Sequence, residues 1–258
     1  MHVPLPRRLL AASILGLAAV AALQGTAQGQ TPTESSVEVR SQLMFRVPDA
    51  TAQRLLPAGW QLNPATTGPA HGANLLIVLT DRLLTQDTEG RPVPGGVGQA
   101  VVLVVPGRNP ATGIAGPVIV GGFATGEGAP GPYGTYAPAA ITHERAVTAG
   151  PDGVRRGQER WSATTPEGDR FELRMRYAVG TPSRTTPQQR VSSGRNPDFH
   201  RIYQVDQGTV VLRAAGTDHI EEFAFAASGP RLGPIFDGSE QLTAVLSLPW
   251  YLRRVSLP

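Results

Sequence analysis

The most restrictive feature of this chain is a strict alternation of apolar and polar residues from 170 to 177 (RFELRMRY), within a strand predicted at 170–179. A period of two places the apolar side chains on one face of a β-strand. The turn PEGD at 166–169 precedes this strand, and 158–164 is predicted to be its hairpin partner. The pattern therefore indicates antiparallel sheet.

Short segments of the same kind recur along the chain. Residues 37–45 alternate, with Glu38, Arg40 and Gln42 on the polar side. Continuous apolar runs, which are typical of strands buried on both faces, lie at 74–80, 100–105 and 117–120. Further strands are predicted at 201–205, 208–214 and 219–226, separated by the turns DQG and AGTD. The period does not decide whether 239–248 is helix or strand.

One short helix is predicted early in the chain, with Asp49 as its N-cap and Pro57 at its end. Loops are predicted at 85–98, 121–138 and 180–197. With 30 Gly and 24 Pro among 258 residues, the chain is unlike a coiled coil. We predict a mainly β protein with a few short helices, folded as an antiparallel barrel or sandwich.

The first residues have the order of a secretory signal. Arg7 and Arg8 precede an uncharged run at 9–23 (LLAASILGLAAVAAL), and small and polar residues follow. The run is shorter than the ~20 residues that span a bilayer, and no second hydrophobic span follows. We expect residues 1–29 to be a signal peptide and 30–258 to be one exported domain, periplasmic or secreted. An uncleaved anchor is the alternative.

Composition excludes several kinds of chemistry. The sequence has no Cys, which excludes disulfides and thiolate metal sites. It also has no Lys, so only the chain terminus has an amine for Schiff-base catalysis. The net charge is +3, and no basic run alternates with aromatic residues. Nucleic-acid binding therefore has no support.

Three segments resemble the acetoacetate decarboxylase superfamily. They are FRVPDATAQRLLPAGWQLNP at 45–64, VGQAVVLVVPG at 97–107 and HERAV at 143–147. The resemblance extends over about 200 residues and implies a closed antiparallel β-barrel around a cavity. The resemblance implies no cofactor, and it is compatible with a homo-oligomer.

The chain departs from that family at the residues that carry its chemistry. The family's enzymes use a lysine as nucleophile, whereas the corresponding region here is AGPDGVRRGQ (149–158). Gly96 takes the place of a loop carboxylate that precedes Gly98 and Gln99. Arginine stays protonated and does not replace a nucleophilic lysine. The resemblance thus implies the fold and the cavity but not the decarboxylation.

His143, Glu144 and Glu159 are the candidate acid and base residues, since a histidine and a carboxylate together transfer protons. On a strand, His143 lies on one face and Glu144 on the other, so a charged solvent face is the alternative. The acidic residues near His219 lack the spacing of a metal site, and no metal is predicted.

The candidate ligand-binding residues follow from the resemblance. Arg155 and Arg156, if they face the cavity, would bind a carboxylate; otherwise they belong to a surface hairpin. Gln99 lies in the matched segment, and Tyr133 and Tyr136 lie in the long Gly/Pro-rich loop, where they either cap the cavity or anchor the loop.

These observations favour an exported barrel protein that binds a small organic acid or ketone without Schiff-base chemistry. Two alternatives stay open: a lysine-independent lyase, hydratase or isomerase of the same fold, and a non-catalytic envelope scaffold. A cavity lined by arginine and apolar groups favours binding, an enclosed acid–base pair favours the enzyme, and a plugged barrel favours the scaffold.

The signal segment makes a direct prediction about the mature N-terminus. Small residues at the −3 and −1 positions place the cut after Ala27 or Gly29. Intact-mass analysis of the protein from a periplasmic fraction should show a chain that begins at Gln28 or Gln30. A chain that keeps residues 1–27 in the membrane fraction would instead indicate an anchor.

Overall fold

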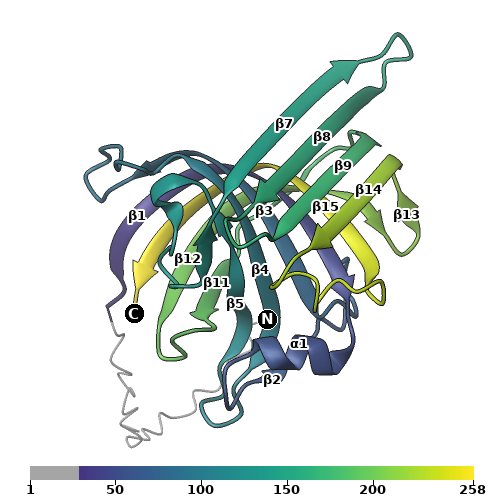
Figure 1. The fold of residues 1–258 in the computed structure, drawn as a ribbon. Helices are drawn as coiled ribbons and strands as arrows, with labels where there is room; N and C mark the ends of the chain where they lie inside the picture. Colours follow the sequence, from purple (N-terminus) through teal and green to yellow (C-terminus); the bar gives the residue numbers. More distant parts are fainter. Residues whose placement is uncertain (1–28) are drawn as a thin grey trace, which may run out of the picture.

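The computed structural model describes residues 29–258, so the predicted signal segment lies outside the described residues except for Gly29. These residues form two β-sheets, one closed and one open (Figure 1). The strands that close into a ring are β1 (Thr31–Arg46), β3 (Leu75–Gln86), β4 (Gly98–Arg108), β5 (Ala115–Ala124), β11 (Gln188–Ser193), β12 (His200–Ala214) and β15 (Gln241–Leu257).

The ring runs in the order β4-β3-β1-β15-β12-β11-β5 and returns to β4, which pairs with both β3 and β5. Six of the seven pairings are antiparallel, and only β5 and β11 are parallel. The predicted closed barrel is therefore confirmed. Short strands extend it: β2 (Gln61–Leu62), β6 (Tyr136–Pro138), β10 (Ser183–Thr185) and β13 (Thr217–Asp218).

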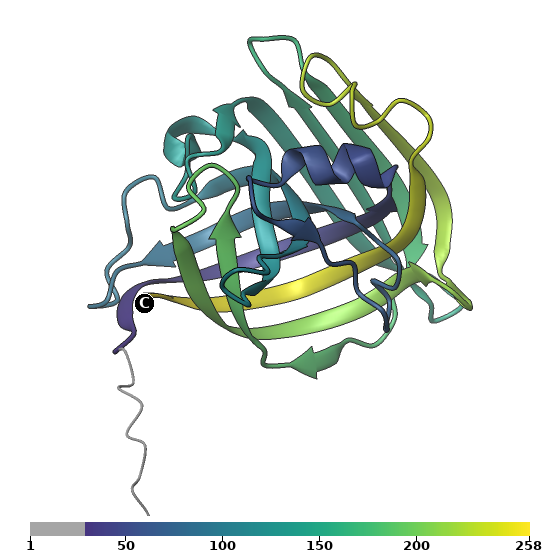
Figure 2. The same ribbon diagram turned by 90° about the horizontal axis from the view of Figure 1, so that it is seen from below.

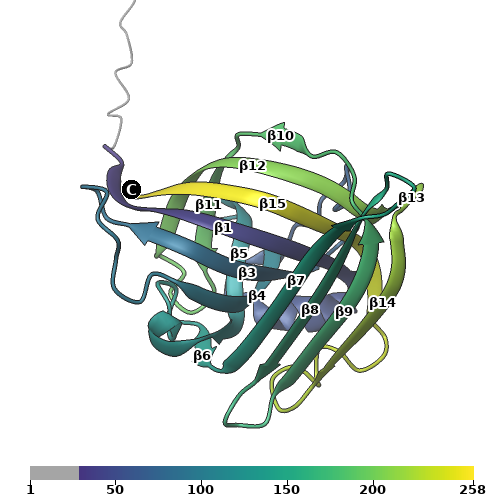
Figure 3. The same cartoon turned by 90° about the horizontal axis from the view of Figure 1, so that it is seen from above.

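The open sheet has the order β14-β9-β8-β7 and lies across the outside of the barrel (Figure 3). Its strands are β7 (Ala140–Ala149), β8 (Arg155–Thr164), β9 (Arg170–Ala178) and β14 (Ile220–Ser228). The alternation in β9 is confirmed, because its apolar side chains are buried against the barrel and its charged ones are largely exposed. The tip of the β7–β8 hairpin projects past the barrel (Figure 1).

The barrel wall is buried on both faces, as the continuous apolar runs predicted. In β3, Leu75, Ile77 and Leu79 point outward into the core shared with the open sheet, whereas Leu76 and Val78 point into the barrel. Alternate residues of each wall strand therefore supply two separate cores.

Helix α1 (Asp49–Leu55) is present as predicted, but Pro48 is its N-cap and Asp49 its first residue. Asp49 instead accepts a hydrogen bond from Asn74 (2.9 Å) and pairs with Arg46. A short 3₁₀ turn, η1 (Gly126–Gly128), follows β5. Within residues 29–258, no helix has the length and apolar character needed to cross a membrane.

Two expectations about the second half need correction, and one open question is resolved. Residues 201–205 and 208–214 form one strand, β12, rather than two. Gly208 marks no turn there; a Cβ at this position would lie 2.3 Å from the Trp250 ring, so the ring requires glycine. Residues 239–248 contribute to strand β15, and the predicted loop at 180–197 contains β10 and β11.

Candidate functional site

The barrel encloses a cavity of about 530 Å³. A second space of about 360 Å³ adjoins it at one mouth, and the two share Arg82, Tyr136, Tyr203 and Arg253 in their walls. Figure 2 looks from below onto the strands that curve around this interior. Sites for small organic ligands have volumes of roughly 300–1,000 Å³. The barrel therefore contains a cavity that is large enough for a small organic ligand.

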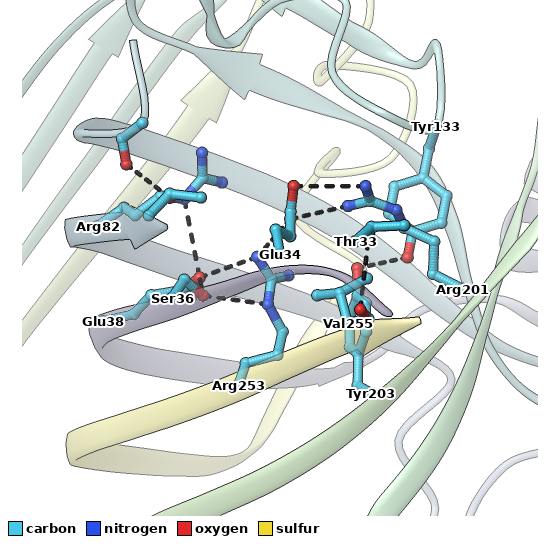
Figure 4. Close-up of polar contacts among 12 residues, drawn as sticks. Thr33, Glu34, Ser36, Glu38, Arg82, Tyr133, Arg201, Tyr203, Arg253 and Val255 are labelled. Carbon is cyan, nitrogen blue, oxygen red and sulfur yellow. Dashed lines mark hydrogen bonds and ion pairs between the residues drawn. The ribbon is translucent and has the colours of Figure 1, made fainter. Parts of the chain in front are cut away.

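One end of the cavity is built around the carboxylate of Glu38, which is completely buried (Figure 4). Ser36 donates a hydrogen bond to its Oε1 (2.7 Å), and Arg40 donates one from Nε to its Oε2 (2.6 Å). Arg253 Nη2 lies 3.2 Å and Arg82 Nε 3.7 Å from Oε1. The Glu38 carboxylate thus forms ion pairs with three guanidinium groups.

This arrangement keeps Glu38 ionised. Burial by itself raises the pKa of the carboxyl, but the charges of Arg40, Arg253 and Arg82 together with the Ser36 hydrogen bond outweigh it and lower the pKa to about 2. Glu38 compensates only one of three positive charges. The remaining positive charge at this end of the cavity favours an anion.

A second ion pair lies nearer the mouth. Arg201 Nη1 donates to Glu34 (3.0 Å), and Arg253 Nη2 lies 3.6 Å from the same oxygen (Figure 4). The Nε atoms of Arg82 and Arg201 are buried and have no hydrogen-bond partner among the described residues. Buried donors normally have partners, so these two indicate acceptors that a ligand or water supplies.

Phenol rings complete the polar end. The guanidinium carbon of Arg40 lies 3.6 Å from the Tyr251 ring centre and that of Arg253 lies 4.6 Å from the Tyr203 ring centre. Burial raises the pKa of both Tyr136 and Tyr251, so their hydroxyls stay protonated at neutral pH. Protonated phenols and guanidinium groups are hydrogen-bond donors, which suits an oxygen-rich anion.

The two predicted tyrosines lie at this end. Tyr136 lines both spaces, and Tyr133 lines the mouth, where its hydroxyl hydrogen-bonds to that of Tyr203 (Figure 4). Ser193 donates a hydrogen bond to the Tyr133 carbonyl (2.9 Å), which fixes the loop. The predicted loop at 121–138 contains the end of β5, the turn η1 and strand β6, and this segment contributes to the cavity wall.

The structure brings together three more of the predicted residues, but between the two sheets rather than in the cavity. Gln99 donates to Asp81 (3.0 Å), Asp81 lies 3.3 Å from His143 Nδ1, and His143 Nε2 lies 3.5 Å from Glu159. The His143 ring stacks on Trp161 with ring centres 3.9 Å apart. None of these residues lines the barrel cavity.

Glu159 is almost fully buried in this layer. Burial by itself raises the pKa of the carboxyl, but His143 and the hydrogen bonds from Trp161 (2.6 Å) and Ser41 (2.8 Å) outweigh it and lower the pKa. An ionised carboxylate held by these donors joins the sheet to the barrel.

Glu144, Arg155 and Arg156 lie elsewhere. Glu144 is exposed on the outer face of β7, as the alternation with His143 predicted. Arg155 is exposed, and Arg156 pairs with Asp152 (2.8 Å) and Glu221 (3.2 Å) on the surface. Strand β8 belongs to the open sheet and not to the barrel, so the arginines lie in a surface hairpin, which was the alternative, and they are not ligand-binding residues of the cavity.

Sequence reasoning missed Glu38, Arg40, Arg82 and Arg253. The alternation over residues 37–45 puts the first two on the polar face of a half-buried strand, and in an open sheet that face meets solvent. In a closed barrel the same face points inward. The signal that could have identified them is a charged residue at an inward position of a strand that is otherwise deeply buried, such as Arg82 at the end of the apolar run of β3.

Among residues 29–258, no cluster of three or more His, Asp or Glu side chains is arranged to hold a metal ion.

Comparisons with known proteins bear on the fold. No known protein family matches the chain, and no curated protein sequence does. Solved structures do match. The enduracididine biosynthesis enzyme MppR with HEPES buffer bound has 12% identity and a TM-score of 0.56 over 91% of this chain and 89% of that chain. MppR complexed with pyruvate has 13% identity and a TM-score of 0.53, covering 95% and 96%.

An acetoacetate decarboxylase-like enzyme from Sphingomonas wittichii RW1 is similar to the same degree. It has 13% identity and a TM-score of 0.52, covering 92% of this chain and 97% of that chain. At these identities the likeness concerns the fold alone. The predicted acetoacetate decarboxylase-like fold is confirmed.

The buried Glu38 cluster predicts how stability depends on pH. Glu38→Gln removes the carboxylate that faces three guanidinium groups and should cost about 3–5 kcal/mol of unfolding free energy at neutral pH. The folded pKa of about 2 lies below the usual 4.5, so the carboxylate stabilises the fold above pH 4.5 and loses this effect as the pH falls toward 2.

Urea unfolding of both proteins between pH 7 and pH 2.5 measures this directly. The difference in unfolding free energy between wild type and Glu38→Gln should shrink as the pH falls below 4.5. A difference that stays constant over that range would contradict the assignment of an ionised Glu38.

Proposed function

We propose that this chain is an exported barrel protein that binds a small organic acid or keto acid in its cavity, without Schiff-base decarboxylation. The observation that carries the proposal is the polar end of the cavity, where the Nε atoms of Arg82 and Arg201 have no hydrogen-bond partner among residues 29–258 and arginines outnumber the carboxylates that pair with them. A carboxylate supplies both the acceptors and the negative charge that this end lacks.

Three further facts support a ligand of this class. The cavity has room for one, at about 530 Å³. The phenols around it are donors, like the guanidinium groups. A structure of the same fold was solved with pyruvate, a keto acid. Export is inferred from the signal-like segment at 1–29, and the absence of lysine from the sequence argues against a Schiff base.

The alternatives fit the cavity less well. A scaffold needs a barrel filled by its own side chains, whereas this one is hollow. An acid–base enzyme needs its proton-transfer groups within reach of the substrate. His143 and Glu159 are paired, but they lie in the layer between the sheets. Glu38 contacts the arginines that line the cavity and is held ionised by them.

Arg82 provides the test, because it faces both spaces and its Nε is 3.7 Å from Glu38, so Arg40 and Arg253 still hold that carboxylate without it. A charge-assisted hydrogen bond contributes ~1.5–3 kcal/mol. Arg82→Gln should therefore weaken binding of pyruvate, acetoacetate or lactate, whichever binds wild type, by about 10- to 100-fold in calorimetric titration.

The matched control is Arg156→Gln, which removes a paired arginine from the surface of the open sheet. It should leave the affinity within about twofold of wild type. Equal losses in the two variants, or no loss in Arg82→Gln, would contradict a carboxylate at the polar end.

A further inference from the structure

The cavity changes character along the barrel axis. Cross-strand register places inward residues of β1, β3 and β4 at common levels. From the polar end, these levels are Arg82 with Glu38, then Thr80 with Arg40 and Ala100, then Val78 with Gln42 and Val102, then Leu76 with Met44 and Val104. The charged groups are therefore confined to one end, and apolar side chains dominate the other.

The apolar section is substantial. Val78, Val102, Leu76 and Val104 line it from one side, and Ile119 and Val191 line it from β5 and β11. At a rise of ~3.3 Å per residue, the four steps from Thr80 to Leu76 span roughly 13 Å along β3. Besides Thr80, the arginines and the tyrosines, the polar side chains that line the cavity are the uncharged amides of Gln42, Asn63, Gln189 and Gln207.

A small acid leaves most of this surface uncovered. Pyruvate or acetoacetate satisfies the donors near Arg82 and Tyr136 but reaches no further into the barrel. The free energy of binding becomes more favourable when an apolar group displaces water from apolar walls. The two ends together match a molecule with a carboxylate at one end and a hydrocarbon at the other.

We propose that the ligand is such an amphiphilic carboxylate, with its head at Arg82 and its hydrocarbon tail between Val78, Val102 and Ile119. This inference rests on the proposed function and specifies its ligand class. The tail points away from the mouth formed by the 121–138 loop, so the carboxylate lies nearest to that mouth.

A chain-length series tests the tail. Each buried methylene contributes ~0.8 kcal/mol, which is about fourfold in affinity. Calorimetric titration of the wild-type protein with butanoate, hexanoate and octanoate should therefore show the dissociation constant falling by about 15-fold for each pair of methylenes added. Octanol, which has the tail without the charge, should bind at least 10-fold more weakly than octanoate.

A pair of variants locates the tail. Val102→Phe fills the apolar section and should abolish the advantage of octanoate over butanoate while butanoate still binds. Val97→Phe is the matched control, since Val97 is exposed just before β4. It should keep the slope of the wild-type series. The series on wild type needs neither variant, so the inference stays testable if Val102→Phe does not fold.

The outcomes separate the two proposals. If butanoate and pyruvate bind but affinity does not rise with chain length, the amphiphile is wrong and the proposed function stands. If no acid binds, the proposed function fails and this inference with it. If octanol binds as tightly as octanoate, a carboxylate head is excluded.

Discussion

The ionised carboxylate of Glu38 is the group on which the polar half of this barrel depends. A guanidinium group is expensive to remove from water unless a counter-charge and hydrogen bonds replace the lost hydration. Glu38 provides that counter-charge to Arg40, Arg82 and Arg253 at once, and Ser36 completes the set. Without it, the three cations inside the seven-strand barrel would repel one another, which destabilises the closed barrel.

The same cluster explains why the barrel is hollow at this point. Side chains that are held by ion pairs and stacked on phenol rings stay against the wall rather than filling the centre. Arg82 lines both spaces and Arg201 lines the mouth, so both arginines border space that a ligand can enter. The open sheet, by contrast, joins the barrel through a different polar layer around Glu159, which connects the two sheets and lies apart from the cavity.

Much of the fold could be predicted from local patterns. β9 alternates strictly because one face meets the barrel and the other meets solvent, and β3 and β4 are continuously apolar because both of their faces are buried. Prediction failed at a glycine, because glycine occurs both in turns and where a neighbouring side chain needs space. Gly208 suggested a turn between two strands, but its missing side chain makes room for Trp250 within a single strand.

The site was harder to predict because the alternation does not show whether the polar face of a strand is exposed to solvent or points into the barrel. Glu38 and Arg40 have the pattern of a solvent face, and only closure of the sheet turns that face inward. Arg155 and Arg156 were singled out by a short resemblance, yet β8 is a strand of the open sheet and carries them to the surface. Tyr133 and Tyr136 were recognised because a long Gly/Pro-rich loop with embedded aromatic residues often contributes to a site.

The most direct test is the mass of the protein as cells produce it. Native and denatured masses of the purified, processed protein should differ by a small component, and the released molecule should be a carboxylic acid with an apolar tail. A protein that carries nothing, and that takes up neither pyruvate nor octanoate when these are supplied in excess, would contradict the account of the cavity as a binding site for organic acids.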